Sequence, residues 1–195
     1  SAFFLVTFVP MKLIRIIPLF LLISCAGSSK YEIKGTLPDP KFDSEWVFLA
    51  PLTGGTAQTV DSVRVKKQSF SFSGRTEQPG VKVIRMRPIM RLEIQELLVV
   101  VEPGKIQVTL DSLSSVTGTP QNDALQSWKE FKAQTDRTLL MLQQMIDAAT
   151  DDTVKTKLTS RRDQIVTDFN EYNRLFVKSN EGNALGDFVS KLTGQ

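Results

Sequence analysis

The spacing of apolar residues changes once along this chain, and that change limits the fold more than any other feature of the sequence. Before residue 120, apolar and polar residues alternate in short runs, as in Tyr31–Gly35. From Asn122 onward, apolar residues recur every three or four positions. A period of two fits half-buried strands, and a period of 3.6 fits amphipathic helices. The sequence therefore predicts an α+β chain with a β-rich module ahead of a helical part.

The β-rich module, residues 31–121, contains seven or eight short strands by this criterion. They are expected at 31–35, 45–49, 59–66, 70–72, 81–87, 92–94, 97–101 and 106–110. Turn signals such as Gly54-Gly55 and Glu102-Pro103-Gly104 separate them. Short strands at roughly ten-residue spacing indicate an antiparallel β-sandwich or a barrel-like module.

Residues 122–195 predict an α-helical hairpin and a short third helix. Asn122 or Asp123 suits the N-cap of the first helix, and Asp151-Asp152 interrupts the pattern and recaps the chain. The third helix is expected at 183–192. We expect the apolar stripes to pack on each other and on the strands, and a partner protein is the alternative.

Residues 1–24 are expected to consist of upstream residues and a lipoprotein signal peptide, with the true start of translation at Met11. From Met11 a charged segment runs to Arg15, an apolar run covers residues 16–23, and Ser24 precedes Cys25. This order is typical of a signal peptide. The apolar run is shorter than the ~20 residues that a membrane-spanning helix needs.

The end of this signal, Leu22-Ile23-Ser24-Cys25, resembles the bacterial lipobox. The resemblance implies cleavage before Cys25 and acylation, for example with palmitate, of its thiol and its new amino group. Residues 25–30 would then form a lipidated tether that holds the domain on a membrane. Ala26 is not the aspartate typical of inner-membrane retention, so we expect the periplasmic face of the outer membrane.

Composition narrows the possible chemistry. Two of the 24 basic residues, Lys12 and Arg15, precede Cys25, so the chain from Cys25 onward has 22 basic and 21 acidic side chains. This nearly neutral balance argues against a nucleic-acid partner. The chain has one cysteine and no histidine. An internal disulfide needs two cysteines, and catalytic triads and the usual zinc sites need histidine or several cysteines. The sequence excludes these features. The sequence therefore predicts no catalytic residues, no metal ligands and no cofactor.

Two groups of acidic residues are candidate sites, although a structural role is favoured for both. Three glutamates could supply paired carboxylates for sugar chemistry: Glu93, Glu96 and Glu102. Three residues of a proline-containing loop offer oxygen ligands for calcium: Asp39, Asp43 and Glu45. Solvation of a strand face explains the first group, and the second lacks the spacing of a known calcium loop.

Asp61 is expected to make a turn or strand-end hydrogen bond rather than to act in catalysis. The densest basic cluster consists of Lys82, Arg85, Arg87 and Arg91. This cluster could meet acidic glycans or lipid headgroups. We favour the alternative that it is the solvated face of an edge strand, where charge discourages pairing with other chains.

Five segments, in this order, resemble one protein family. They are Tyr31–Leu37, Val60–Val63, Phe70–Gly74, Glu102–Val108 and Gly118–Asn122. Together they resemble the module catalogued as domain of unknown function 4369, which is common in envelope lipoproteins of gut-type anaerobes. That module often stands ahead of a thioredoxin-like domain.

The chain departs from this family at two points. Lys67-Gln68-Ser69 replaces a glycine turn, and the Cys-x-x-Cys motif of thioredoxin chemistry does not occur. We therefore expect a lipid-anchored, non-catalytic envelope module that binds an unidentified protein or glycan. The alternative is the N-terminal domain of a truncated thioredoxin-like thiol–disulfide oxidoreductase.

Overall fold

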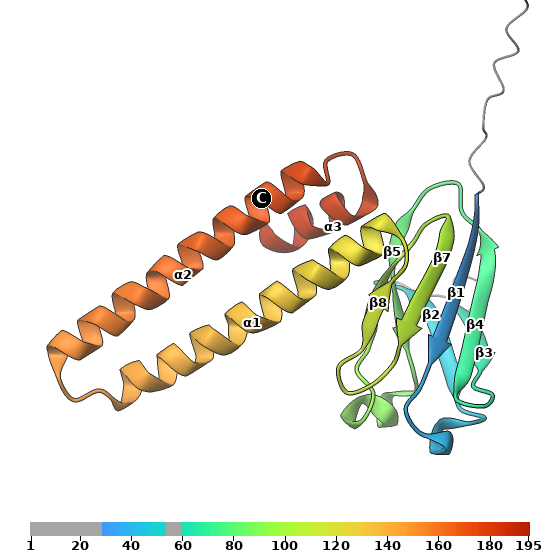
Figure 1. The fold of residues 1–195 in the computed structure, drawn as a ribbon, viewed down its shortest axis with the longest axis horizontal. Helices are drawn as coiled ribbons and strands as arrows, with labels where there is room; N and C mark the ends of the chain where they lie inside the picture. Colours follow the sequence, from blue (N-terminus) through green and yellow to red (C-terminus); the bar gives the residue numbers. More distant parts are fainter. Residues whose placement is uncertain (1–28, 54–59) are drawn as a thin grey trace, which may run out of the picture.

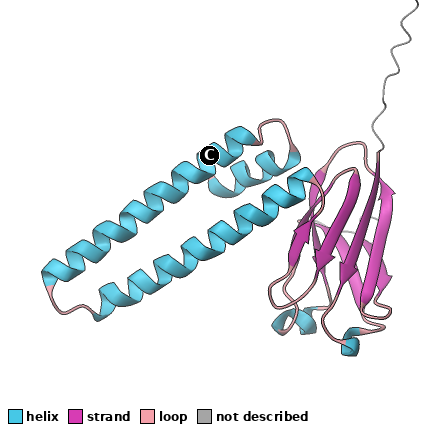
Figure 2. Cartoon of the chain, viewed as in Figure 1, coloured by secondary structure: helices cyan, strands magenta, loops and turns pink. Residues whose placement is uncertain are grey.

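The structure is a computed structural model that describes residues 29–53 and 60–195. Within these residues, eight strands form two facing four-stranded sheets, and three helices follow (Figures 1 and 2). Sheet A contains, in spatial order, β4 (Ser69–Arg75), β1 (Lys30–Thr36), β7 (Gly104–Thr109) and β8 (Ser115–Thr117). Sheet B contains β3 (Asp61–Arg64), β2 (Trp46–Pro51), β5 (Gly80–Arg85) and β6 (Leu97–Val101).

The predicted α+β class and the sandwich are confirmed, and the barrel alternative is wrong because the two sheets stay separate. The expectation of purely antiparallel strands holds for sheet B but not for sheet A. There β1 pairs antiparallel with β4 and parallel with β7, with Ile33 opposite Ile106. These two strands are far apart in the chain, so no tight hairpin forces them to run in opposite directions.

The core lies between the sheets, where alternate residues of every strand point inward. Ile33, Phe72 and Ile106 come from sheet A, and Leu49 and Leu97 come from sheet B; all five are at most 2 % exposed. The period of two seen in the sequence is therefore the alternation of core and surface positions.

Two elements differ from the sequence prediction. Residues 92–94 are not a strand, because Pro88–Leu92 forms a short 3₁₀ helix with proline at its start. Leu92 is 97 % exposed, whereas Ile94 is buried. The strand β8 was not predicted, because its three residues are too few to show a period.

The helical part begins at Pro120, two residues before the expected position. Helix α1 covers Pro120–Ala148, α2 covers Asp152–Ser179 and α3 covers Ala184–Thr193. The prediction that Asp151 recaps the chain is confirmed, because its carboxylate accepts a hydrogen bond from the Val154 amide at 2.9 Å. The N-cap of α1 is Thr119, and Asn122 has a different role that is described below.

Helices α1 and α2 form an antiparallel hairpin that projects away from the sandwich (Figure 1). Only its base touches the strands, where α1 contacts β6 and β8 and α3 contacts β5. Leu125, Trp128, Leu185 and Val189 are buried at this base and extend the core. The predicted packing of helices on strands is therefore confirmed for the base of the hairpin alone.

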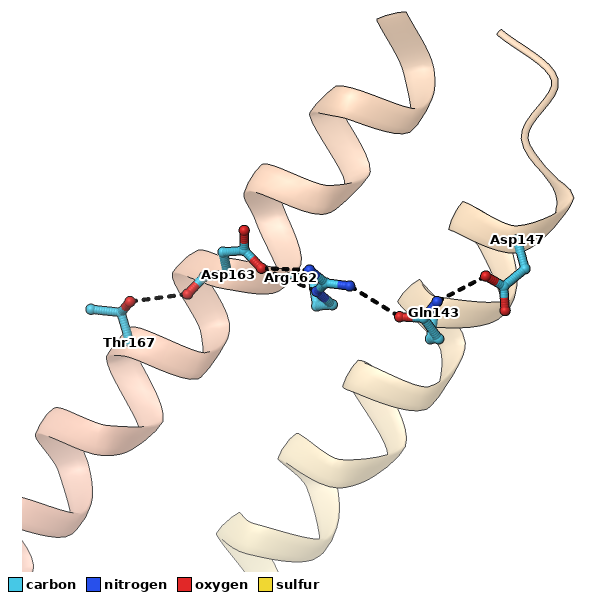
Figure 3. Close-up of polar contacts among 5 residues, drawn as sticks. All are labelled: Gln143, Asp147, Arg162, Asp163 and Thr167. Carbon is cyan, nitrogen blue, oxygen red and sulfur yellow. Dashed lines mark hydrogen bonds and ion pairs between the residues drawn. The ribbon is translucent and has the colours of Figure 1, made fainter. Parts of the chain in front are cut away.

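In the distal half of the hairpin, α1 and α2 pack against each other and against no other element of the described residues. Ile146 is buried there, whereas Leu140 and Met141 are more than half exposed. A polar contact joins the helices: Arg162 of α2 donates a hydrogen bond to the Gln143 side chain of α1 at 3.1 Å (Figure 3). Arg162 also pairs with Asp163 within α2. In the part of the chain that is described, no helix is long and apolar enough to span a bilayer.

Candidate functional site

The three glutamates proposed for sugar chemistry do not meet at a common site. Glu93 pairs with Lys41, and Glu96 pairs with Arg91 at 2.8 Å. Glu102 is buried and accepts two hydrogen bonds from Gln121, one from its amide nitrogen and one from its side chain, both at 2.9 Å. Glu102 thus holds the first turn of α1, where a negative charge is favourable.

Asn122 completes this joint between the sandwich and the helices. Its amide oxygen accepts a hydrogen bond from the Val100 nitrogen, and its amide nitrogen donates to the Val100 oxygen, both at 2.8 Å. The side chain is completely buried. It satisfies backbone groups of β6, which is an edge strand of sheet B. The Gly118–Asn122 segment of the family pattern is therefore a structural joint.

The three candidate calcium ligands also have separate structural roles. Asp39 caps the 3₁₀ helix Pro40–Phe42, and Glu45 accepts hydrogen bonds from Arg87. Asp43 accepts hydrogen bonds from the amides of Lys67 and Gln68, which both have positive φ angles. Asp43 thus stabilises the turn that replaces the glycine turn of the family. No group of three possible metal ligands occurs in the ranges that the structure describes.

Asp61 makes the local hydrogen bond expected of it, accepting from the Ser62 amide at 2.8 Å. It also lies near Tyr31, where burial, and to a lesser extent the charge of Asp61, raises the pKa of the phenol. Both groups stand at the end of the sandwich where β1 begins. A strand-end role accounts for Asp61 without any catalytic function.

The basic cluster at residues 82–91 does not form one surface. Lys82 and Arg85 are on β5, which is a central strand and not the edge strand that was expected. Arg87 pairs with Glu45, and Arg91 pairs with Glu96. Two of the four basic side chains are therefore engaged in separate ion pairs with glutamates. The predicted lipidation site, Cys25, lies outside the described residues.

A polar surface that sequence reasoning missed is the outer face of sheet A. We call it the polar face, and it consists of Lys30, Glu32, Lys34 and Thr36 of β1, Ser69, Ser71, Ser73 and Arg75 of β4, and Lys105, Gln107 and Thr109 of β7. The three helices pack beside β8 and against β5 and β6 (Figure 1), so among the described residues they leave the outer side of β1, β4 and β7 uncovered. Its signal in the sequence was the run of polar residues at every second strand position.

Residues in neighbouring strands form cross-strand rows on the polar face. Lys34 lies between Ser71 and Gln107, and Glu32 lies between Ser73 and Lys105. Glu32 forms an ion pair with Lys34 at 3.2 Å. Serine side chains are short, so a ligand can approach the sheet closely along β4.

Two open hollows lie along the polar face. The larger, about 820 Å³, is lined by Lys34 and Gln107 and reaches Trp46, Arg64 and Lys66 at its rim. The smaller, about 600 Å³, surrounds Tyr31 where β1 begins. Both are shallow grooves rather than enclosed pockets, a shape that suits an extended ligand or a surface more than a small molecule.

Trp46 and Arg64 form a fixed pair at the rim of the larger groove. The Arg64 guanidinium lies 4.5 Å from the centre of the indole ring and donates a hydrogen bond to the Ser44 carbonyl oxygen at 2.7 Å. Trp46 is still 37 % exposed. The pair thus presents both an aromatic edge and a positive charge to a ligand.

Glycines explain the close pairing of β1 with β4 beneath this face. A Cβ atom on Gly35 would lie 1.9 Å from the ring of Phe70, and one on Gly74 would lie 2.8 Å from the Tyr31 hydroxyl. Each glycine is directly opposite its aromatic partner. Only glycine leaves room for these rings. The pattern therefore accounts for two segments of the family resemblance, Tyr31–Leu37 and Phe70–Gly74.

The fold defines the chain as a β-sandwich domain that carries a helical hairpin at one edge, next to β6 and β8. Residues 31–125 match the model of the family described as "Domain of unknown function (DUF4369)". The match ends in the first turns of α1 and thus includes the joint at Glu102 and Asn122. Searches of the curated proteins and of the solved structures found no match.

Proposed function

We propose that this protein is a lipid-anchored, non-catalytic binding module of the bacterial cell envelope, and that the polar face is its binding surface. The observation that carries the proposal is the polar face with its open grooves, which the helices, packed against β5, β6 and β8, do not cover.

The anchor in this proposal is Cys25, supported by the lipobox-like segment Leu22–Cys25. Anchoring would place the module at the periplasmic face of the outer membrane. The non-catalytic role is supported by the structural partners of Glu93, Glu96 and Glu102.

Acylation is tested by growing cells that express the chain with an alkyne analogue of palmitate. We expect label on the wild-type protein and no label on the Cys25→Ser variant. A wild-type protein without label would contradict the anchor.

The alternative function, the N-terminal domain of a thioredoxin-like oxidoreductase, is supported by the family resemblance alone. It requires that the gene continue past Gln195 into a second domain. A stop codon directly after Gln195 would exclude it.

A further inference from the structure

We infer that the polar face binds anionic phospholipid headgroups and thereby lays the sandwich against the membrane. This inference rests on the proposed function, because it names the partner of the same face. Charge, shape and the position of the tether support it.

Positive charge is concentrated on this surface. The two grooves are lined by one carboxylate, Glu32, and by six basic side chains: Lys30, Lys34, Arg64, Lys66, Arg75 and Lys105. The chain after Cys25 has 22 basic and 21 acidic side chains, so the rest of the molecule balances this excess. A basic surface on a nearly neutral protein attracts anionic lipids when it lies within a Debye length of the bilayer.

The form of the surface suits a plane of headgroups. Ser69, Ser71 and Ser73 alternate along β4 on the outer side, and each is exposed. Short hydroxyl side chains let phosphate groups approach the strands and can donate hydrogen bonds to them. Trp46 and Arg64 at the rim are residue types that favour the membrane–water interface.

The tether brings this face to the membrane. Lys30 begins β1 and is part of the polar face, and four residues separate it from Cys25. A fully extended chain of that length spans roughly 18 Å. An acylated Cys25 would thus hold the Lys30 end of the polar face close to the headgroups. Ionic attraction between the basic side chains and anionic lipids would then bring the rest of the polar face into contact with the membrane.

The test uses the expected mature chain, residues 25–195, with Cys25→Ser, so that neither acylation nor the apolar signal segment has a part in the result. Binding is measured by co-sedimentation with vesicles of phosphatidylcholine alone and of phosphatidylcholine with 30 % phosphatidylglycerol, at low and at high salt. The test variant is K34E/R75E/K105E, which reverses three exposed charges of the face. The matched control, K155E/K157E/K178E, reverses three exposed charges on α2. Circular dichroism checks the fold of both.

We expect the parent and the control variant to bind anionic vesicles more tightly than neutral ones, with an affinity that falls as salt rises. K34E/R75E/K105E should lose at least tenfold in affinity for the anionic vesicles. Equal binding by the two triple variants would overturn the inference. So would binding of soluble polygalacturonate through these residues without binding of vesicles, because the partner would then be an anionic glycan. A failure of Cys25 to be acylated would leave these results unchanged, so the two proposals fail separately.

Discussion

Buried polar residues of this chain mainly join elements that are distant in sequence. The Asn122 side chain hydrogen-bonds to the Val100 backbone at the free edge of β6, as a neighbouring strand would. The Glu102 carboxylate accepts a hydrogen bond from the Gln121 backbone amide at the start of α1. The sequence marked both residues as part of a family pattern but did not reveal these contacts. Their partners lie 19 to 22 positions away, and a period or a spacing reports only on neighbours within one element.

Replacing Asn122 with alanine should therefore destabilise the protein strongly. The substitution leaves the Val100 amide and carbonyl groups buried without partners, which costs about 3 kcal/mol. Urea denaturation measures the change in the free energy of unfolding. The control N170A removes an exposed amide of α2 and should change it by less than about 0.5 kcal/mol. A loss for N122A as small as that of the control would contradict the proposed joint.

Lys129 makes stability depend on pH. Burial lowers the pKa of its ammonium group to about 8, where it donates a hydrogen bond to the Ser114 carbonyl oxygen at 3.2 Å. Below pH 8 the lysine is charged in both folded and unfolded states, and burial of the charge opposes folding. Between about pH 8 and the ordinary lysine pKa, the unfolded state binds more protons, so stability rises with pH.

The variant K129M should lack this rise. We expect the difference in stability between K129M and the wild type to favour K129M most at pH 7 and to shrink towards pH 10. Urea midpoints at both pH values measure it, with K155M on the exposed surface of α2 as the control. Parallel pH profiles for K129M and the wild type would show that Lys129 is not the group responsible.

Among the elements, the long helices and most strands could be predicted from the sequence because their periods extend over enough residues. The three-residue β8 and the 3₁₀ helix at Pro88–Leu92 could not. The periodicity of α1 and α2 also did not reveal that their distal halves extend beyond the sandwich and make no contact with its described strands. A helical stripe shows that a face is covered, but it does not identify what covers it.

The distal hairpin should therefore open more easily than the sandwich. Ile146 is 5 % exposed and is the buried apolar side chain nearest the tip of α1 among the described residues. Replacing Ile146 with alanine should lower the free energy of unfolding by about 2 kcal/mol. This value is at the lower end of the range for buried isoleucines, because two helices can move together to fill the cavity.

Hydrogen exchange locates the effect. In I146A, amides of the distal parts of α1 and α2 should exchange faster, while those of β1 and β7 keep the wild-type rate. M145A is the matched control, since Met145 is 52 % exposed and its loss should change little. Equal acceleration in the strands would mean that the hairpin and the sandwich unfold as one unit.

The whole molecule is asymmetric, and the proposed function depends on that asymmetry. The described helices pack beside β8 and against β5 and β6, at one edge of the sandwich (Figure 1). The strands β1, β4 and β7 of sheet A carry a basic, hydroxyl-rich surface away from that edge. A lipid anchor would thus leave the hairpin free while the polar face meets its partner. The sequence supplied the lipobox resemblance, but the uncovered face became apparent only when β1, β4 and β7 were placed side by side.

The intact mass of the protein extracted from the membranes of its source cell tests the central claim most directly. The account predicts a mass equal to residues 25–195 plus acyl groups on Cys25. An acylated species heavier by about one domain would retain the anchor and support the oxidoreductase alternative. A mass that retains residues before Cys25 and carries no acyl groups would contradict the account.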